Sequence, residues 1–549
     1  MSRRGIRSSS RRQAVDSAAT VSGTAWLRVS VVIADPPCRR GRQCNWARES
    51  PVLGFSSGPD GRSTLPSVTT GPSITTRTPS RTRDRNALRT RRSIGLALGL
   101  FVLVLPWFLN LEGLSEPGHR MLGVFLMAIV LWVTEAIPLY ATAALIIFLQ
   151  ILFISDQALW DLPAGFEAPT SASYFATLAH PVLMLFLGGF FLAEGAARYR
   201  LDRNLARIML RPFGDSPAMI VLGLMVITAA FSMFMSNTAT TATFLAVVLP
   251  VVATLEPGDR LRVALVMAIP LAANIGGIAP PVGTPPNAIA IGSLEEAGIS
   301  VSFIRWMALA TPAMIVLLLF GWQLIVRLFP ASTERLTLNI EGSFDQTRPA
   351  LVFYLTAAAT IVLWLSEPIH GVSASVVGFM PVVVLLATGV LDSKDLQKMP
   401  WHVLWLVAGG VALGLAVNDS GLDRWLIDQV GWDAVPVGLL ALALAFVATS
   451  MSTVISNSAA ANLLIPIGLT LTVSGTVDLE PLAAGFFIAI GASLAMALPV
   501  STPPNAIAYS TGALTTGAMA RVGLAVGVVG LALFVFIAPL LWELMGVSP

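Results

Sequence analysis

The chain has 549 residues, of which 55% are hydrophobic and only 12% are charged. Soluble domains carry roughly 25% charged residues, so this composition excludes an ordinary soluble protein and indicates an integral membrane protein. The formal net charge of +3 is unevenly distributed, because 18 of the 34 Lys and Arg residues lie in the first 92 positions. Both cysteines, Cys38 and Cys44, lie there too, so no thiol or disulfide chemistry belongs to the apolar part.

Residues 1–91 are rich in Arg, Ser, Thr and Pro and show no sustained apolar periodicity, which predicts disorder. A basic segment beside apolar sequence is typical of a cytoplasmic tail near lipid and not of nucleic-acid binding. Two interpretations stay open. The tail has no function, or translation begins further along; alternatively, the tail acts at the membrane surface or in regulation.

From Ile94 onward apolar runs follow one another, and a helix needs roughly 20 residues to cross the hydrocarbon core. Eleven spans are predicted, near residues 94–111, 121–137, 139–155, 181–197, 262–291, 310–329, 350–366, 372–391, 402–417, 482–509 and 521–542. Two further apolar segments, 217–252 and 437–470, are too long for one span and have a polar centre. They are predicted to be re-entrant hairpins, since irregular backbone is tolerated where it lines a cavity.

Charge placement predicts the orientation of these spans. With the tail inside, the inner loops hold thirteen Lys and Arg residues and the outer loops hold Arg120, Arg305 and Arg424. This bias predicts a multi-pass protein of the plasma (inner) membrane with a cytoplasmic amino terminus and an external carboxyl terminus. No Lys or Arg is left for the bilayer interior.

The sequence contains an internal duplication. Four ordered matches occur at an offset of 218 to 221 residues. They are Gly188-Gly189 with Gly409-Gly410, Leu201-Asp202-Arg203 with Leu422-Asp423-Arg424, Ser236-Asn237-Thr238 with Ser456-Asn457-Ser458, and Gly283-Thr284-Pro285-Pro286-Asn287 with Ser501-Thr502-Pro503-Pro504-Asn505. The spans holding Gly188 and Gly409 run in opposite directions, so the repeats are inverted, as in many secondary transporters.

The polar motifs predict helix starts within the membrane. Thr284 and Thr502 each precede a proline, the pattern of a hydroxyl N-cap with proline at the first helical position, and the two triplets can cap the second arms of their hairpins. Free N–H groups at such starts suit an anion, while hydroxyl and amide oxygens suit Na⁺. A bound dianion would then need co-bound cations. The alternative is that the hydroxyls bond their own helices and the prolines mark kinks.

Together with FLGGF at 186–190 and WVTEAIP at 132–138, these motifs resemble the divalent anion/sodium symporter family of dicarboxylate, citrate and sulfate transporters. The resemblance covers residues 94–549 and implies a homodimer, with a scaffold part and an elevator-like transport part in each protomer. The corresponding boundaries are a tail at 1–92, scaffold helices at 93–180 and 310–400, transport parts at 181–309 and 401–520, and a last helix at 521–549.

Carried over by position, the resemblance implies two sodium sites and one substrate site. One sodium site has Ser232, Ser236, Asn237 and the backbone at Gly283, and the other has Ser452, Ser456, Asn457 and the backbone at Ser501. The substrate contacts are Ser236, Asn237, Thr238, Ser456, Asn457 and Ser458, with Thr284, Pro285, Thr502 and Pro503 completing the pocket. Ser452, Ser458 and Pro280 stand where the family often has Thr, which leaves the substrate and the sodium stoichiometry open.

The leading hypothesis is a sodium-coupled symporter for a C4 dicarboxylate such as succinate, malate or fumarate, with Na⁺ as the co-transported ion. A sodium-independent dicarboxylate exchanger and a sodium/sulfate symporter are alternatives. An enzyme is not expected, because the spans lack cysteine, an HExxH motif and paired carboxylates. A channel could use the same oxygens, but hairpins in inverted repeats favour alternating access. Glu194, near a span end, is either an ion ligand or a structural hydrogen-bonding group.

Overall fold

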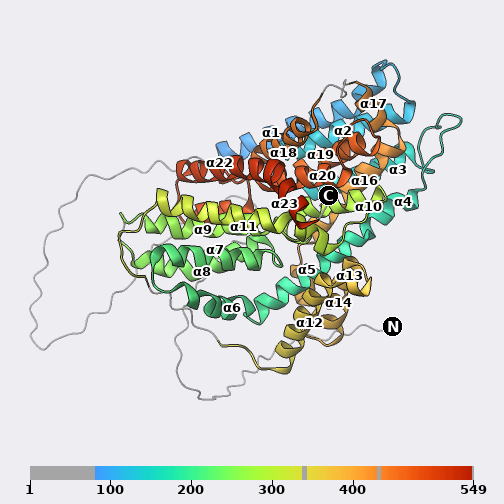
Figure 1. Cartoon of the computed structure of the whole chain (residues 1–549). Coiled ribbons are helices and arrows are strands. Elements are labelled where there is room, and N and C mark those ends of the chain that lie inside the picture. Colours follow the sequence, from blue (N-terminus) through green and yellow to red (C-terminus); the bar gives the residue numbers. More distant parts are fainter. Residues whose placement is uncertain (1–80, 257, 337–342, 430–434, 547–549) are drawn as a thin grey trace, which may run out of the picture. The chain divides into compact units, whose positions relative to one another are not determined.

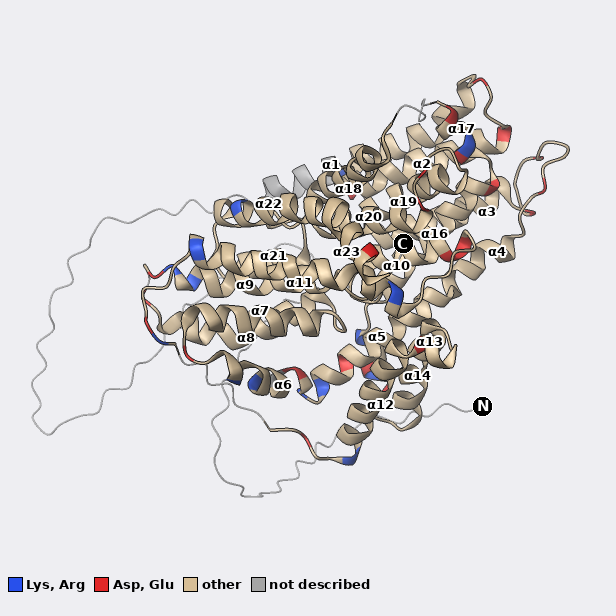
Figure 2. Cartoon of the chain, viewed as in Figure 1, with Lys and Arg blue, Asp and Glu red and all other residues tan. Residues whose placement is uncertain are grey.

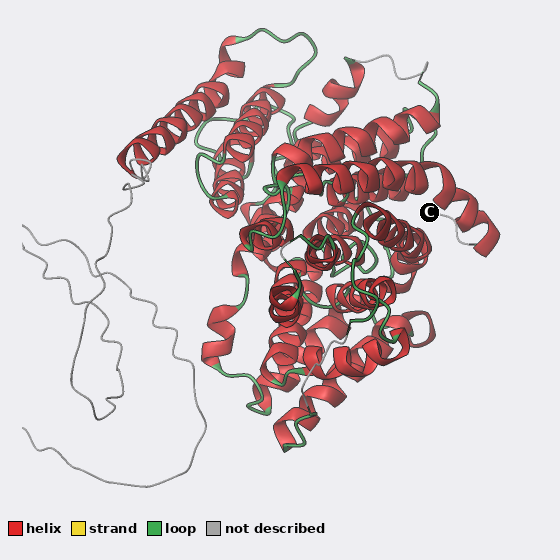
Figure 3. Ribbon diagram, turned by 90° about the vertical axis from the view of Figure 1, so that its left-hand side faces the viewer, coloured by secondary structure: helices red, strands yellow, loops and turns green. Residues whose placement is uncertain are grey.

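The structure, a computed structural model, describes residues 81–256, 258–336, 343–429 and 435–546. Within these ranges the chain is helical and contains no strand (Figure 3). Eight of the helices there are long and apolar enough to cross a membrane, and shorter apolar helices accompany them. The predicted all-α polytopic membrane fold is confirmed.

The first helices are α1 (Arg81–Val104), η1 (Leu105–Phe108), α2 (Glu116–Thr134) and α3 (Leu139–Ile154). They match the first three predicted spans, but α1 begins at Arg81, so the prediction of disorder is wrong for residues 81–91. Arg, Ala and Leu are good helix formers and extend an apolar helix at little cost. The remainder of the predicted tail, residues 1–80, lies outside the described residues.

The first repeat contains a helix pair and an interrupted helix. Its elements are α4 (Ser171–Ala176), η2 (Thr177–Ala179), α5 (Pro181–Arg198), α6 (Leu201–Leu210), η3 (Arg211–Phe213), α7 (Pro217–Ser232), α8 (Asn237–Thr254), α9 (Leu261–Gly276) and α10 (Pro285–Glu296). Helices α7 and α8 pack together, while the chain between α9 and α10 is non-helical. The predicted break inside 262–291 is therefore present.

The central helices are α11 (Phe303–Leu328), α12 (Arg348–Leu365), α13 (Glu367–His370), α14 (Ala374–Ala387) and α15 (Ser393–Lys398). The second repeat has α16 (Trp401–Asp419), α17 (Leu422–Asp428), α18 (Val437–Val454), α19 (Asn457–Val473), α20 (Pro481–Ser493) and α21 (Pro503–Ser510). The chain closes with α22 (Thr516–Ala532), the π-helical turn η5 (Leu533–Ile537) and α23 (Ala538–Met545). Helices α18 and α19 pair as α7 and α8 do, and α20 and α21 are separated by a second non-helical connection.

Proline determines where many of these helices begin. It stands in the first turn of α5, α7, α10, α12, α20 and α21. A proline there removes an N–H group that has no partner within the helix, and its fixed φ suits the helical conformation. The same residue blocks the preceding residue from continuing a helix, so each proline also sharpens the break before it.

The two repeats interlock. Helices α7 and α8 pack on α9, and α18 and α19 pack on α20, within each repeat. Across the repeats, α10 packs on α19 and α20, while α21 packs on α8 and α9. Each interrupted helix therefore lies with its second half against the hairpin of the other repeat. Figure 1 shows α10 near α19 and α20, and Figure 2 shows α21 near α9.

Small residues join these central helices to the remaining ones. Helix α5 packs against α14, and a Cβ atom added to Gly188 would collide with the backbone of Gly378. Helix α16 packs against α3, where a Cβ atom added to Gly409 would collide with Ala143. The duplicated glycines thus allow two close helix contacts that correspond to each other in the repeats, as small residues do in membrane helix pairs.

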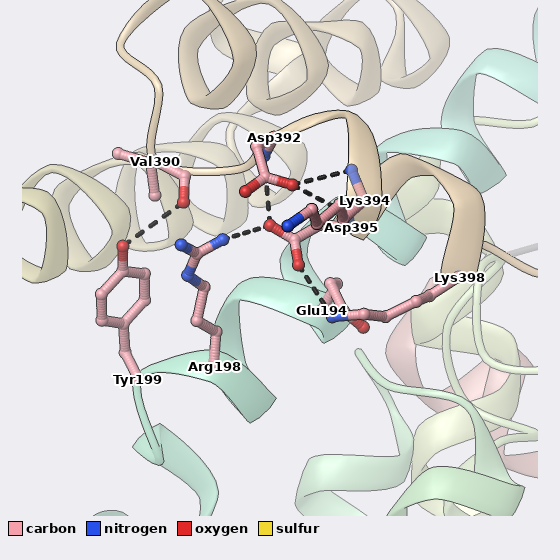
Figure 4. A network of polar contacts seen from close by, with 8 residues as sticks. All are labelled: Glu194, Arg198, Tyr199, Val390, Asp392, Lys394, Asp395 and Lys398. Atoms are coloured by element: carbon pink, nitrogen blue, oxygen red, sulfur yellow. Dashed lines mark hydrogen bonds and ion pairs between the residues drawn. The ribbon is translucent and has the colours of Figure 1, made fainter. Parts of the chain in front are cut away.

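A polar network joins the carboxyl-terminal end of α5 to α15 (Figure 4). Asp395 pairs with Arg198 and lies 2.8 Å from the Lys398 Nζ atom, which is 3.1 Å from Glu194 Oε1. Asp392 and Asp395 also form a capping box at the start of α15. Glu194 therefore has a structural partner at the end of its helix, which favours its structural interpretation.

Candidate functional site

The two predicted triplets lie at the tips of the hairpins. Ser236 is the N-cap of α8 and its Oγ accepts a hydrogen bond from the Ala239 N–H at 3.2 Å. Ser456 is the N-cap of α19 and accepts from Ala459 at the same distance. Both triplets cap the second arm of their hairpin, as predicted from the sequence.

Next to each tip, three oxygen atoms lie close together. In the first repeat the Ser232 Oγ is 2.6 Å from Asn237 Oδ1 and 2.7 Å from the Ala273 carbonyl oxygen. In the second repeat the Ser452 Oγ is 2.7 Å from Asn457 Oδ1 and 2.7 Å from the Ala492 carbonyl oxygen. The hydroxyl has one proton and can serve only one of its two acceptors. A hard cation placed among the three oxygens would serve all of them.

The non-helical connections are held by one asparagine each. Asn287 Nδ2 donates to the carbonyl oxygens of Ile278 at 3.1 Å and Pro280 at 2.9 Å. Asn505 Nδ2 donates to the corresponding carbonyls of Met496 at 2.9 Å and Leu498 at 3.0 Å. The last residue of each predicted five-residue motif therefore organises the chain that precedes its own helix.

The predicted backbone ligands lie at these connections. A Cβ atom on Gly277 would be 2.6 Å from Asn237 Oδ1, and one on Gly283 would collide with the Gly277 carbonyl group, so these backbones lie against the first tip. In the second repeat the Ser501 hydroxyl donates to the Thr453 carbonyl oxygen at 3.4 Å, which joins that connection to α18. The structure thus assembles Ser232, Asn237 and Gly283 around one tip.

The helix starts differ from the prediction. The Thr502 Oγ1 accepts from the Asn505 N–H, but the Thr284 hydroxyl makes no capping bond, so the predicted cap is present in α21 and absent in α10. Each of these helices also begins with two prolines, which have no N–H group to offer an anion. The prediction that free N–H groups at the starts of α10 and α21 bind an anion is therefore wrong for the first two residues of each helix.

The hairpin tips supply donors instead. In the described part of the chain, the N–H groups of Asn237 and Thr238 at the start of α8 have no acceptor, and the same holds for Asn457 and Ser458 at α19. Free N–H groups and the helix dipole make such starts suitable for anions. Ser236 and Thr238 are exposed and the second triplet is half-buried, whereas Ser232 and Ser452 are fully buried.

Asn274 connects the two halves of the site and was missed from the sequence. Its Nδ2 atom donates to Thr502 Oγ1 and to Asn505 Oδ1, both at 3.1 Å, across the repeat boundary. The equivalent residue of the second repeat is Ser493, whose hydroxyl bonds the Ala489 carbonyl of its own helix. In the sequence, the sign of a functional position was a single amide residue, Asn274, inside the apolar run IPLAANIGG. Thr284, which makes no capping bond, therefore lacks the partner that Thr502 has in Asn274.

The described helices that meet at the tips carry no charged side chain near the tips that could neutralise an anion. Arg262, the one Lys or Arg of α9, stands in the first turn of that helix, at the end away from Gly276. Helices α7, α8, α18, α19, α20 and α21 contain no Asp, Glu, Lys or Arg, and Figure 2 shows the charges at helix ends and in loops. A cavity of about 700 Å³ lies elsewhere, between the start of α5 and the end of α16. Its lining includes the carboxylates of Glu296 and Asp419, with His180 beside Glu296, so the two carboxylates disfavour a dianion there.

Pairs of interrupted helices and hairpins, duplicated and interlocked in an all-helical membrane protein, define a secondary transporter. The chain matches the family described as "Sodium:sulfate symporter transmembrane region" over residues 86–548. It belongs to this family, which confirms the resemblance found in the sequence. The protein is therefore a multi-pass membrane transporter with Na⁺ as the co-transported ion, and not an enzyme.

Two relatives are similar over most of their length. One, from Staphylococcus saprophyticus, is named sodium-dependent dicarboxylate transporter SdcS and is 31% identical over 501 residues, which cover 83% of this chain and 93% of the relative. A protein of the same name from Staphylococcus aureus is 28% identical over 503 residues, covering 83% of this chain and 92% of the relative.

Proposed function

We propose that the protein is a sodium-coupled symporter of a C4 dicarboxylate such as succinate, malate or fumarate. The observation that carries this proposal is the duplicated cluster of oxygens, in which Ser232 and Ser452 each bring together an asparagine oxygen and a backbone carbonyl oxygen. Hydroxyl, amide and unwound-backbone oxygens are the ligands with which transporters of this architecture hold Na⁺.

Electrostatics gives a reason for the coupling. A dicarboxylate carries two negative charges. Helices α7, α8, α18, α19, α20 and α21 provide no Lys or Arg to balance them, and Arg262 of α9 stands at the end of that helix away from the tip. Moving a charge from water into a low-dielectric site costs several kcal/mol unless a partner is present. Sodium ions beside the carboxylates supply this partner, and the free N–H groups of the two tips add to it.

The residues divide into two roles. Ser232, Ser236, Asn237 and Gly283 hold one sodium ion, and Ser452, Ser456, Asn457 and Ser501 hold the other. The substrate carboxylates lie between the tips, against the exposed and half-buried atoms of Ser236, Asn237, Thr238, Ser456, Asn457 and Ser458, with Thr284, Pro285, Thr502 and Pro503 at the sides. Ser232 and Ser452 are fully buried, whereas the first triplet is partly exposed and the second is half-buried. This difference supports sodium ions at the buried serines and the anion at the more accessible triplets.

The movement we propose is elevator-like alternating access in a homodimer, with the amino terminus inside and the carboxyl terminus outside. The interlocking of α10 with α19 and α20, and of α21 with α8 and α9, supports movement of these helices as one unit. We also propose that the two hairpins are re-entrant and that the two repeats are inverted relative to each other.

The names of the two relatives support a dicarboxylate, and the family description supports sulfate as the second candidate. Sulfate is also a dianion, and sodium ions could balance its charge in the same way. Its charge surrounds a single sulfur atom, whereas a C4 dicarboxylate has two separate carboxylates. Two tips with free N–H groups suit a ligand with two charged ends.

Uptake of radiolabelled succinate into proteoliposomes tests the proposal. We expect accumulation only with an inward sodium gradient, and competition by unlabelled malate and fumarate but not by sulfate. A Ser232→Ala, Ser452→Ala double variant is expected to lose sodium activation. Thr254→Ala is the matched control, because this exposed hydroxyl bonds only the Val251 carbonyl at the far end of α8.

Each other outcome selects a different function. Uptake that ignores sodium and requires dicarboxylate inside the vesicle would identify an exchanger. Sodium-driven uptake of sulfate without succinate uptake would identify a sulfate symporter. A sodium dependence that is unchanged in the double variant would remove the two oxygen clusters from the mechanism.

A further inference from the structure

An apolar cavity of about 250 Å³ lies behind the tip of the first hairpin, among helices α5, α6, α7 and α12. All the residues that line it are apolar. Phe231, Phe234 and Met235, which lie beside Ser232 and Ser236, form one side. An apolar cavity of about 150 Å³ already stays dry and takes up benzene. This larger cavity therefore suits a hydrocarbon and neither water nor a dicarboxylate.

Helix α6 forms another wall and has two different faces. Leu201, Leu205 and Met209 line the cavity, whereas Arg207, Ile208 and, just after the helix, Arg211 are exposed. The one acidic residue of the helix, Asp202, is buried. An amphipathic helix with a basic outer face lies at the level of the lipid headgroups, with its apolar face against the acyl chains. The cavity under α6 is therefore at the depth where acyl chains begin.

We propose that this cavity binds an acyl chain of an anionic phospholipid, with the headgroup on the basic face of α6. Three features support this occupant: the lining is entirely apolar, an amphipathic helix forms its wall, and the exposed Arg207 and Arg211 on the outer side are complementary to an anionic headgroup. The inference requires that the protein lies in a membrane, as its family does, and does not depend on which anion it transports.

The occupant would act on the first hairpin alone. The residue of the second hairpin that corresponds to Phe234 is Val454, which is 78% exposed, so nothing in the described part of the chain covers that tip at the matching place. An acyl chain behind Phe234 supports the tip that positions Ser232 and Asn237. A lipid that binds only when the cavity is formed stabilises that conformation relative to conformations without the cavity.

Photolabelling tests the proposal on the full-length purified protein. The probe is phosphatidylglycerol with a diazirine on one acyl chain, and labelled peptides are identified by mass spectrometry. We expect the label in peptides containing residues 201–209, 231–235 and 353–361, above that on the exposed helix faces. If these peptides are labelled no more than exposed faces such as that of α14, the proposal fails on the wild-type protein alone.

Two variants on one helix sharpen the test. Ala357→Phe fills the cavity and is expected to reduce labelling of the lining peptides several-fold, whereas Ala358→Phe, at the exposed neighbouring position of α12, should leave it unchanged. Met209→Trp fills the cavity from α6 and repeats the test if Ala357→Phe folds poorly. Labelling that persists in both filled variants would place the lipid outside the cavity and overturn the proposal.

The headgroup is tested separately. Phosphatidylcholine with the same photoreactive chain is expected to label the lining more weakly than phosphatidylglycerol. Addition of phosphatidylglycerol to delipidated protein in detergent should raise the melting temperature of the wild type and of Ala358→Phe, but not of Ala357→Phe. Equal labelling by the two lipids would remove the role of the basic face of α6.

Discussion

Ser232 and Ser452 each face two oxygen acceptors with a single proton. Both are fully buried, and their partners come from the next helix of the hairpin and from the interrupted helix behind it. One proton cannot satisfy both acceptors, so the cluster has more oxygen acceptors than donors. Such a set of oxygens is well suited to bind a cation. The same arrangement in both repeats makes it a property of the duplicated unit.

Asn237→Ala and Asn457→Ala are each expected to weaken sodium activation of transport. Each change removes one oxygen from a charged site, and hydrogen bonds to charged groups contribute about 1.5–3 kcal/mol, which corresponds to roughly ten- to hundredfold in sodium affinity. The sodium concentration for half-maximal uptake measures this effect. Melting temperatures of the variants separate it from misfolding, and normal sodium activation would exclude these oxygens as ligands.

Asn274→Leu is expected to lower stability by about 1–3 kcal/mol, because it leaves the buried Asn505 Oδ1 without a donor. Ser493→Ala is the matched control in the second repeat. Its hydroxyl bonds only the Ala489 carbonyl of its own helix, so little change is expected. Thermal unfolding in detergent compares the two. Equal losses would mean that the bonds across the repeat boundary contribute no more than a bond within one helix.

At the scale of the element, the contact of α5 with α14 leaves no room for a side chain at one glycine. Gly188 faces the backbone of Gly378 without room for a Cβ atom, whereas a Cβ atom on the neighbouring Gly189 would meet only Val282 at 3.6 Å, an ordinary contact. The first glycine of the pair is therefore required by packing, and the second is not.

Gly188→Ala is expected to separate α5 from α14 and to cost about 1–3 kcal/mol through overpacking. Gly189→Ala is expected to be neutral or slightly stabilising, because Ala is a better helix former than Gly. Yield and melting temperature of both proteins, purified in parallel, measure the difference. A stable Gly188→Ala protein with full uptake would show that this helix contact tolerates separation.

The network between α5 and α15 predicts a pH effect. Burial raises the pKa of Asp395, but the hydrogen bonds from Lys398 and the Asp392 N–H, with the charge of Arg198, outweigh it and hold the pKa below its ordinary value of 3.8. A lowered carboxyl pKa stabilises the folded state above pH 3.8, and this stabilisation is lost as the pH falls through the lowered value.

Asp395→Asn is therefore expected to destabilise the folded state at pH 6–7, by about 1 kcal/mol or more, because the charge-assisted bonds to Arg198 and Lys398 are weakened, and thus to lower the melting temperature. The difference from the wild type should diminish at acid pH, below the pKa of the wild-type carboxyl group. Lys394→Ala is the control, since only its backbone N–H takes part in the cap. A difference that is the same at pH 7 and at acid pH would exclude an electrostatic origin.

At the scale of the whole molecule, the unit that begins at α1 contains both hairpins, both interrupted helices and all the proposed site residues. Deletion of residues 1–80 is expected to leave succinate uptake and membrane yield unchanged. The deletion ends before Arg81 because α1 begins there. Normal expression with lost uptake would assign the tail a role in transport.

The sequence by itself determined the membrane class, the places of the helices and the duplicated motifs, because these depend on local features. Apolar run length defines a span, proline defines a helix start, and a repeat can be read at a constant offset. The position of the hairpin tips and the two helix breaks followed in the same way. The early start of α1 did not, because a charged stretch next to a helix carries no apolar periodicity.

Only the tertiary structure decided how these parts meet. The pairing of Ser232 with the Ala273 carbonyl and the bonds of Asn274 to Thr502 and Asn505 join residues 41 to 231 positions apart. No local pattern encodes such contacts, since the first arises from packing α7 on α9 and the others from packing α21 on α9 of the opposite repeat. For the same reason the difference between Thr284 and Thr502 became visible only in the fold: identical motifs acquire different hydrogen bonds when their neighbours differ.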